Sequence, residues 1–273
     1  MSTTTTIGVF DSGFGGLTVL RELLPLVPGA HYIYLGDTAR LPYGSKSQAT
    51  IARYAAESAR FLESRGADHL VIACNTASAL AMDEITAAVR IPVTGVISPV
   101  VQLTHDRYPG ADTLILATAA TVQSHAYRDS CEAAGLPATE KACPLLVPLI
   151  EEGWIDHPVT RDVLRIYLRE ALALCSPQVV ILGCTHYPLI APLVALTLQE
   201  LGSNAEVIDS AQATARTVAH MLSQNGTPHP ATTTPHAATC EFFATDSVEK
   251  FARLGSRFLA RPLEEVQLVD LGG

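Results

Sequence analysis

Two aliphatic segments in this chain each end in a cysteine that polar residues follow. One is Leu-Val-Ile-Ala-Cys-Asn-Thr-Ala at 70–77, and the other is Val-Val-Ile-Leu-Gly-Cys-Thr-His-Tyr-Pro at 179–188. A short aliphatic run bounded by small and polar residues is typical of a strand buried on both faces of a parallel sheet. The pattern therefore predicts an α/β fold in which Cys74 and Cys184 each lie at the carboxyl end of a buried strand.

The carboxyl ends of parallel strands are where open α/β sheets bind ligands, because the loops there border a crevice. Two such ends, one in each half of the chain, suggest two thiols that face one site. The alternative is that both cysteines only pack, since cysteine behaves as a small hydrophobic residue. Polar neighbours that a plain core strand would avoid argue against it; they are Asn75, Thr76, Thr185 and His186.

Composition and charge exclude several classes of protein. The 273 residues carry 27 acidic and 18 basic side chains that do not cluster, so we expect no nucleic-acid partner. No apolar run reaches membrane-spanning length and no apolar leader opens the chain, so we expect no membrane partner and a cytoplasmic location. The six cysteines form no C-x-x-C pair or zinc pattern, so we predict free thiols and no metal site.

The first strand and its turn carry a candidate acidic group. Residues 7–10 predict a strand, and the turn Asp-Ser-Gly-Phe-Gly-Gly at 11–16 leads into a helix. Glycines let backbone amides approach a ligand, but G-F-G-G is not the dinucleotide pattern G-x-G-x-x-G. Asp11 at the strand's end favours a functional turn over a plain one.

Cys74 is expected at a helix start, where the helix dipole stabilises a thiolate.

The second half of the chain repeats the plan of the first. A strand is predicted at 114–118, and the interval from Thr118 to Cys184 is 66 residues, close to the 63 residues from Asp11 to Cys74. Similar spacing of a polar residue and a cysteine at strand ends predicts two related α/β halves.

Two later segments complete the organisation. Glu151 follows an apolar run; it is either a surface carboxylate or one that reaches His186. Residues 225–239, rich in Thr, Pro, His and Ala, predict a flexible linker in which His229 and His236 are solvated. After the linker we expect a strand at 242–245, a helix opened by a capping box at 246–249, and a last strand at 266–269.

Five segments together resemble glutamate racemases of the aspartate/glutamate racemase superfamily. They are Asp-Ser-Gly-x-Gly-Gly at 11–16, Asp-Thr-Ala-Arg-Leu-Pro-Tyr-Gly at 37–44, Ala-Cys-Asn-Thr-Ala at 73–77, Val-Pro-Leu-Ile-Glu at 147–151 and Leu-Gly-Cys-Thr-His-Tyr-Pro-Leu at 182–189. The resemblance implies a cofactor-independent racemase of glutamate that supplies D-glutamate for peptidoglycan. It also implies two pseudo-symmetric parallel-sheet α/β domains facing across a central cleft, residues 1–97 with 208–273 against 98–207. We expect a homodimer; some members bind DNA gyrase, a contact that nothing in this sequence supports.

Racemisation removes the proton on Cα and returns one to the opposite face, so two bases are an economical arrangement. Cys74 and Cys184 supply them, and each thiol needs a partner because its ordinary pKa leaves it only partly ionised at neutral pH. By resemblance Asp11 assists Cys74, and His186, oriented by Glu151, assists Cys184. The resemblance assigns substrate contacts to Ser12, Tyr43, Gly44, Asn75, Thr76, Thr118, Thr121 and Thr185.

Other functions fit the sequence less well or remain open. Pyridoxal phosphate requires a Schiff-base lysine, and none of the three lysines lies in a convincing setting. A cysteine hydrolase would leave Cys74 unexplained, and His186 is poorly placed two residues after Cys184. Racemisation of aspartate or another amino acid remains an alternative, because one methylene changes binding by only about 1–3 kcal/mol. A protein that binds an amino acid without turnover is the alternative outside the enzymes.

Overall fold

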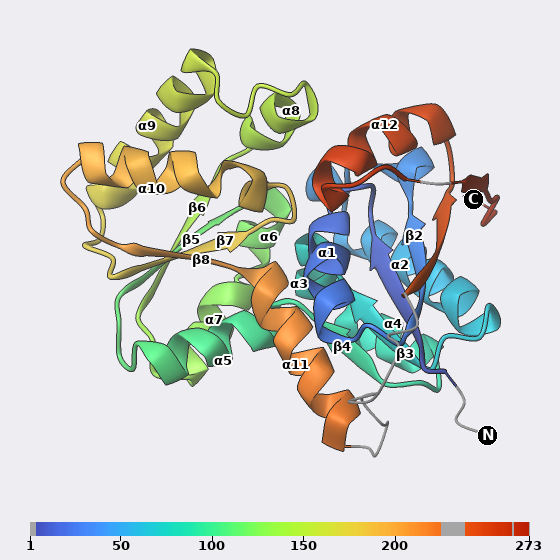
Figure 1. Cartoon of the computed structure of the whole chain (residues 1–273). Helices are drawn as coiled ribbons and strands as arrows, with labels where there is room; N and C mark the ends of the chain where they lie inside the picture. The colour runs from blue at the N-terminus through green and yellow to red at the C-terminus, as the bar shows by residue number, and fades with distance from the viewer. Residues whose placement is uncertain (1–3, 225–237, 264, 273) are drawn as a thin grey trace. The chain divides into compact units, whose positions relative to one another are not determined.

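The computed structural model describes residues 4–224, 238–263 and 265–272. Its contacts divide the chain into two compact units: unit 1 is Met1–Val96 with Ala211–Gly273, and unit 2 is Ile97–Ser210. Each unit contains one sheet in which every strand pairing is parallel, covered by helices on both faces (Figure 1). The predicted α/β class with two parallel sheets is confirmed.

Unit 1 has a six-stranded sheet in the order β10-β9-β2-β1-β3-β4. Its strands are β1 (Thr6–Asp11), β2 (His31–Gly36), β3 (His69–Ile72), β4 (Val93–Gly95), β9 (Thr239–Ala244) and β10 (Val266–Leu268). Alternate strand residues point to opposite faces of a sheet. Ile33 and Leu35 therefore join one buried cluster, while Tyr34 between them meets Phe251 across the other face, with ring centroids 5.9 Å apart.

The helices of unit 1 cover these two faces (Figure 1). Residues of α2 (Gln48–Ser64), α3 (Asn75–Leu80) and the junction with α4 (Met82–Ala88) belong to the cluster that contains Ile33 and Leu35. On the opposite face α1 (Leu17–Leu26) packs against α12 (Val248–Leu259). From Ala211 on, α11 (Ser210–Gln224) also belongs to unit 1, and its Met221 lies 3.9 Å from the hydroxyl of Thr94 on β4.

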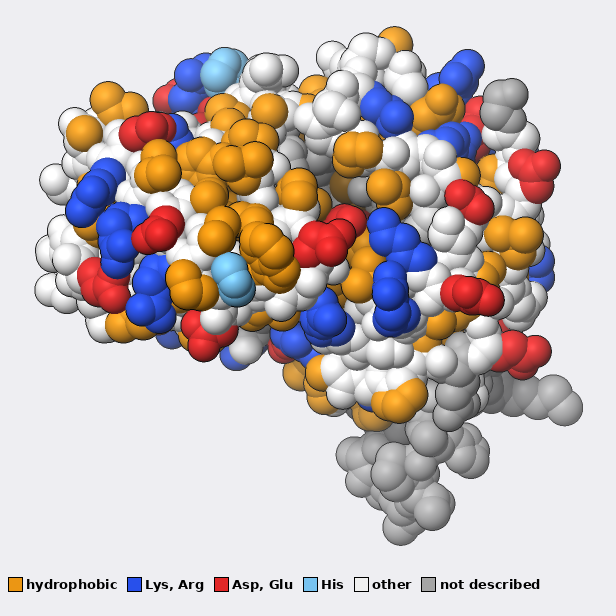
Figure 2. Space-filling model, turned by 90° about the horizontal axis from the view of Figure 1, so that it is seen from above, with side chains coloured by type: hydrophobic (Ala, Val, Ile, Leu, Met, Phe, Trp, Pro, Cys, Tyr) orange, Lys and Arg blue, Asp and Glu red, His pale blue; other side chains and the backbone are white. Residues whose placement is uncertain are grey.

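Unit 2 has a four-stranded sheet in the order β6-β5-β7-β8. The strands are β5 (Thr113–Ala117), β6 (Ala138–Ala142), β7 (Val179–Gly183) and β8 (Glu206–Asp209). One face carries α5 (Ile97–Arg107) and α7 (Ala126–Ala133), and the other carries α9 (Pro158–Leu172) and α10 (Ala191–Glu200) (Figure 1). Short helices α6 (Ala119–Ser124), α8 (Leu146–Glu151) and η3 (Tyr187–Ile190) follow the strands. Apolar side chains gather on the outer surface of α9 and α10, among them Val159, Ile166 and Leu196 (Figure 2).

The two sheets share a four-strand core, because the order β2-β1-β3-β4 in unit 1 matches β6-β5-β7-β8 in unit 2. The related halves predicted from spacing are present, but the equivalence of Asp11 with Thr118 is wrong by one residue. Phe10 pairs with Ile72, so the register places Ser12 level with Cys74. Ala117 pairs with Gly183, so Thr118 is level with Cys184 and corresponds to Ser12.

The carboxyl-terminal segment differs from the expectation in two places. The capping box at 246–249 is wrong: α12 begins at Val248, and Ser247 before it has a left-handed φ of 51° without a side-chain cap bond. The backbone there is held elsewhere, since the Asp246 amide donates to the hydroxyl of Thr38 at 2.8 Å. The expected linker at 225–239 is wrong at its last residue, because β9 starts at Thr239. Its residues 225–237, with His229 and His236, lie outside the described residues.

Glycines allow a close approach of backbone at the turn after β1. A Cβ at Gly16 would lie 2.6 Å from Cβ of Asp11, and one at Gly36 would lie 2.3 Å from the carbonyl oxygen of Gly13. Contacts this short do not occur, so both positions require glycine. Across the described part of the chain, the helices are too short or too polar to span a membrane.

Candidate active site

Unit 1 places an acid, a hydroxyl and a thiol on adjacent strand ends. Asp11 ends β1, and Cys74 follows β3, its neighbour in the sheet. Both side chains are buried, with 1% and 4% exposure. Sγ of Cys74 lies 3.5 Å from the hydroxyl of Ser12 and accepts the Ala77 amide at 3.4 Å, which makes Cys74 the N-cap of α3. Asp11 accepts the Gly13 amide at 2.9 Å and so shapes the turn.

The predicted thiolate at Cys74 is contradicted by its surroundings. Burial and, after it, the charge of Asp11 raise the pKa of the Cys74 thiol to about 12, against smaller opposing effects of Ser12 and the Ala77 amide. The helix start was expected to favour the anion, but α3 has only six residues, and desolvation outweighs one turn of amides. In the resting protein Cys74 is therefore a thiol, and a nearby carboxylate can accept its proton but does not stabilise its anion.

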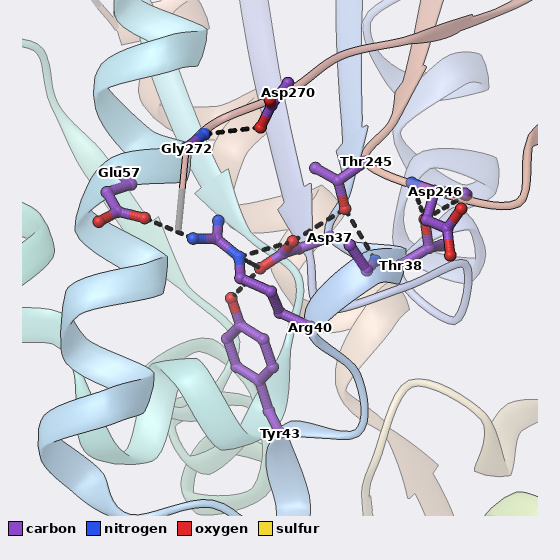
Figure 3. A network of polar contacts seen from close by, with 10 residues as sticks. Asp37, Thr38, Arg40, Tyr43, Glu57, Thr245, Asp246, Asp270 and Gly272 are labelled. Carbon is purple, nitrogen blue, oxygen red and sulfur yellow. Dashed lines mark hydrogen bonds and ion pairs between the residues drawn. The ribbon is translucent and has the colours of Figure 1, made fainter.

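The remaining predicted residues of unit 1 surround this thiol. Asn75 and Thr76 form the first turn of α3, with side chains 3% and 4% exposed. Tyr43 and Gly44 belong to η2 (Tyr43–Ser45); the Tyr43 ring is buried in the same cluster as Cys74, and Gly44 is half-buried. The Tyr43 hydroxyl donates to Asp37 at 2.5 Å (Figure 3). Because this hydroxyl is bound to Asp37, Tyr43 can contact a substrate through its main chain.

Unit 2 places a thiol and an imidazole on the loop after β7. Cys184 follows the strand directly and is 5% exposed. Nδ1 of His186 lies 4.0 Å from Sγ of Cys184, and Nε2 lies 3.3 Å from a carboxylate oxygen of Glu151. Glu151 ends α8, and the hydroxyl of Tyr187 donates to the carbonyl of Cys143 just before that helix at 3.0 Å. The loop and the helix are thereby held together, and the sequence-based idea that Glu151 reaches His186 matches this geometry.

The protonation state of His186 follows from its two partners. Burial alone lowers the pKa of the imidazole, but hydrogen bonds to Cys184 and Glu151, together with their negative charges, outweigh it and raise the pKa to about 10. The imidazolium form can donate from Nδ1 toward sulfur and from Nε2 toward the carboxylate at the same time. Cys184, His186 and Glu151 therefore form a line along which a proton can move.

Three threonines complete the unit 2 group. Thr118 follows β5, and its hydroxyl caps α6 by accepting the Thr121 amide at 3.4 Å. The hydroxyls of Thr118 and Thr121 are 2.9 Å apart. The Thr185 hydroxyl lies 3.3 Å from Nδ1 of His186. The predicted residues thus fall into two groups, one at the strand ends of each unit, which we call half sites.

Comparison with known proteins assigns this arrangement to a family. The profile of the family described as Asp/Glu/Hydantoin racemase matches residues 7–218. A glutamate racemase of Koribacter versatilis is 50% identical over 98% of this chain and 98% of its own length. The chain belongs to the glutamate racemases of this family.

Solved glutamate racemases have the same fold. A crystal structure from Francisella tularensis, in complex with D-glutamate, superposes with a TM-score of 0.88 at 34% identity and covers 98% of both chains. A glutamate racemase of Escherichia coli, in complex with L-glutamate and the activator UDP-MurNAc-ala, gives a TM-score of 0.77 at 28% identity and covers 99% of this chain and 100% of its own. These relatives match along nearly their whole length, so both units belong to the glutamate racemase fold.

The structure of this glutamate racemase family member also contains polar residues that the motifs did not single out. Asp37 and Arg40 lie in the segment 37–44 that carries the resemblance, and their spacing of three residues is the one signal in the sequence that they pair. Their partners Glu57 and Thr245 are distant in the sequence and gave no signal. Among the described residues no group of three or more His, Cys, Asp or Glu side chains is placed to hold a metal ion.

Proposed function

We propose that this protein interconverts L- and D-glutamate without a cofactor, with Cys74 and Cys184 as the two proton-transfer groups. One observation carries the proposal: the cysteines follow β3 and β7, which are equivalent strands of the four-strand core that the two sheets share, and each has its own acidic or basic partner. Membership of the glutamate racemase family supports glutamate as the substrate. Two thiols of this kind suit a reaction that breaks and remakes one C–H bond from opposite faces.

The difference between the half sites suggests how a turnover from L- to D-glutamate begins. In our proposal Cys184 removes the Cα proton, having passed its own proton to His186, while Glu151 stabilises the imidazolium. Cys74 is a thiol in the resting protein, so it is ready to donate a proton to the other face of Cα. Each turnover transfers one proton from carbon to sulfur on one side and one from sulfur to carbon on the other. In the same proposal Asp11 accepts the Cys74 proton when the reaction runs in reverse.

The substrate contacts of this proposal come from uncharged groups. Hydroxyls, an amide side chain and backbone N–H groups can bind carboxylates without a strong positive field. The arginine next to these groups, Arg40, is already paired with Asp37 and Glu57. The proposed contacts are Ser12, Tyr43, Gly44, Asn75 and Thr76 from unit 1, and Thr118, Thr121 and Thr185 from unit 2.

The wider biological setting is part of the proposal. We propose that residues 1–97 with 208–273 and residues 98–207 act as two domains, each of which contributes one half site to the binding of one glutamate. We further propose that the D-glutamate is used for peptidoglycan in the cytoplasm. A homodimer stays a prediction, and sedimentation equilibrium tests it.

Optical rotation tests the activity directly. The purified protein, incubated with L-glutamate and no added cofactor, is expected to bring the rotation to zero. L-aspartate in a parallel sample separates the two substrates. Unchanged rotation with glutamate, together with heat released on titration of glutamate, would leave amino-acid binding without turnover as the function.

Isotope exchange tests the role of each thiol. Cys74→Ser and Cys184→Ser are both expected to abolish racemisation, because the far face can no longer be protonated. In D₂O each variant should still exchange the Cα proton of one enantiomer, and the two variants should act on opposite enantiomers. By resemblance Cys74 serves D-glutamate and Cys184 serves L-glutamate. Racemisation by either variant at near the wild-type rate, or exchange of the same enantiomer by both, contradicts the two-thiol mechanism.

A further inference from the structure

A buried carboxylate gathers three donors beside the proposed glutamate contacts of unit 1. The Asp37 side chain is fully buried. Its oxygens accept Nε of Arg40 at 2.8 and 3.0 Å, the hydroxyl of Tyr43 at 2.5 Å and the hydroxyl of Thr245 at 2.9 Å (Figure 3). The donors come from η1 (Thr38–Arg40), from η2 and from the residue after β9. One carboxylate therefore joins three segments of the chain.

Arg40 extends the network to helix α2. Its side chain is 11% exposed, and its Nη1 donates to Glu57 while Nε is bound to Asp37. The guanidinium also lies over the ring of Tyr54, 4.2 Å from the centroid. A planar group held by two carboxylates and one ring has little freedom to turn. The loop that begins at Asp37 is thereby fixed to a helix of the core.

The same network reaches the proposed acid and the thiol. The Asp37 amide donates to the carbonyl of Asp11 at 3.0 Å, so the residue that binds Tyr43 is also bound to the end of β1. The Tyr43 ring packs on Phe10, with centroids 6.2 Å apart, and shares the buried cluster of Cys74. On the outer side, the Ala39 amide donates to the Thr245 hydroxyl at 2.9 Å. Asp37 is thus the shared anchor of the turn that carries Asp11 and of the segment that carries Tyr43.

Stability alone is a weak reason to bury such a network. Replacing a buried ion pair by apolar groups of similar size is often neutral or stabilising, whereas a fixed register is the best-attested benefit of keeping one. The segment it holds consists of two single-turn 3-10 helices, η1 and η2, which have poor hydrogen-bond geometry of their own. Such a segment needs outside anchors to keep its amides in one place.

We infer that Asp37 and Arg40 are positioning residues for glutamate: they hold the main chain of Tyr43 and Gly44 in the binding geometry and do not touch the substrate. The inference rests on the proposed function, in which Tyr43 and Gly44 contact a substrate carboxylate. The Tyr43 hydroxyl is then an anchor to Asp37 and not a substrate ligand. Loosening the network should weaken glutamate binding more than it slows the chemical step.

Tyr43→Phe is the sharpest variant, because it removes only the hydroxyl that binds Asp37 and keeps the ring. Its matched control is Tyr32→Phe on β2, which removes a buried hydroxyl that donates to the carbonyls of Leu23 and Val27 at 3.2 and 3.0 Å, away from the loop. We expect Tyr43→Phe to raise KM for L-glutamate about tenfold or more and to leave kcat within about threefold. A tenfold change corresponds to about 1.4 kcal/mol, which is close to the contribution of a hydrogen bond to a charged group. Tyr32→Phe should lower the melting temperature without changing KM.

Two further variants follow the network away from the substrate. Asp37→Asn should raise KM at least as much as Tyr43→Phe, and Arg40→Lys should give an intermediate KM because lysine keeps the charge but not the planar fork. The positioning role is wrong if the wild type racemises glutamate and Tyr43→Phe leaves KM unchanged or raises it no more than Tyr32→Phe does. The proposed function would stand in that case. Absence of racemisation in the wild type overturns the proposed function and this inference with it.

Discussion

The Cys74 thiol is expected to react with alkylating agents far more slowly than an ordinary thiol. Burial and the charge of Asp11 raise its pKa to about 12 from the usual 9.0. At pH 8 the thiolate fraction is then about one in 10⁴ where an ordinary thiol has about one in ten, so the rate falls by about 10³-fold from ionisation alone. Asp11→Asn keeps the shape but removes the charge. It should lower the pKa of Cys74 and raise the alkylation rate about tenfold for each unit by which the pKa falls.

Mass spectrometry of peptides resolves the reaction of each cysteine with iodoacetamide, and a Cys184→Ser background leaves the unit 1 half site intact. The decisive quantity is the pH dependence, because restricted access slows the reaction at every pH, whereas only a raised pKa moves the midpoint. Between pH 6.5 and 10.5 the Cys74 rate should rise about tenfold per pH unit without a plateau.

Ser12→Ala is the matched control for Asp11→Asn, since it removes a neighbour whose hydrogen bond lowers the Cys74 pKa. It should leave the rate at pH 8 unchanged or lower. A plateau between pH 8 and 9.5, or an Asp11→Asn variant that reacts no faster than the wild type, would refute the reasoning from burial and charge.

Three other outcomes are expected. Because the pKa of His186 is raised from 6.5 to about 10, its bound proton stabilises the folded protein fully below pH 6.5, and that contribution is lost as the pH rises through 10. The difference in free energy of unfolding between the wild type and His186→Asn, measured by urea denaturation, should therefore shrink across that range, and a constant difference contradicts it. Gly36→Ala should lower the free energy of unfolding by roughly 1–3 kcal/mol or more, because its Cβ would meet the Gly13 carbonyl at 2.3 Å. Gly13→Ala, on the other side of this contact, places its Cβ an ordinary 3.4 Å from Leu41 and should change the free energy of unfolding little; equal losses would show that the contact is not the cause. Racemisation should survive dialysis, chelators and carbonyl reagents but not thiol alkylation, and a loss to chelator that added metal restores would contradict the proposed mechanism.

The elements that carry Cys74 and Cys184 were predictable from the sequence because burial on both faces leaves an unbroken aliphatic run. The presence of two related halves was predictable from the repeated spacing of polar strand ends. The register did not follow, since a spacing of 63 or 66 residues cannot distinguish Asp11 from Ser12 as the partner of Thr118. Only the pairing of Phe10 with Ile72 decides it.

The electrostatics of the half sites depend on burial, which local patterns do not contain. A helix start predicted a thiolate at Cys74, whereas the structure surrounds that sulfur with core residues and a carboxylate. The contact between Thr245 and Asp37 joins residues 208 positions apart, and no local signal marks either as a partner of the other. The contact between Glu151 and His186 was foreseeable because both residues lay in segments that the family resemblance had already brought together.

The position of β9 in the sheet determines when the Tyr43 segment can be fixed during synthesis. This strand pairs with β2 although it is made after the whole of unit 2, and Thr245 behind it supplies one of the three donors to Asp37. A chain still on the ribosome can complete unit 2 while the sheet of unit 1 lacks β9 and β10. Domains generally fold as units, so unit 2 has every strand of its sheet first and unit 1 closes last. The Tyr43 segment therefore acquires its full set of anchors only when Thr245 has emerged, which keeps shorter nascent chains from presenting a finished half site.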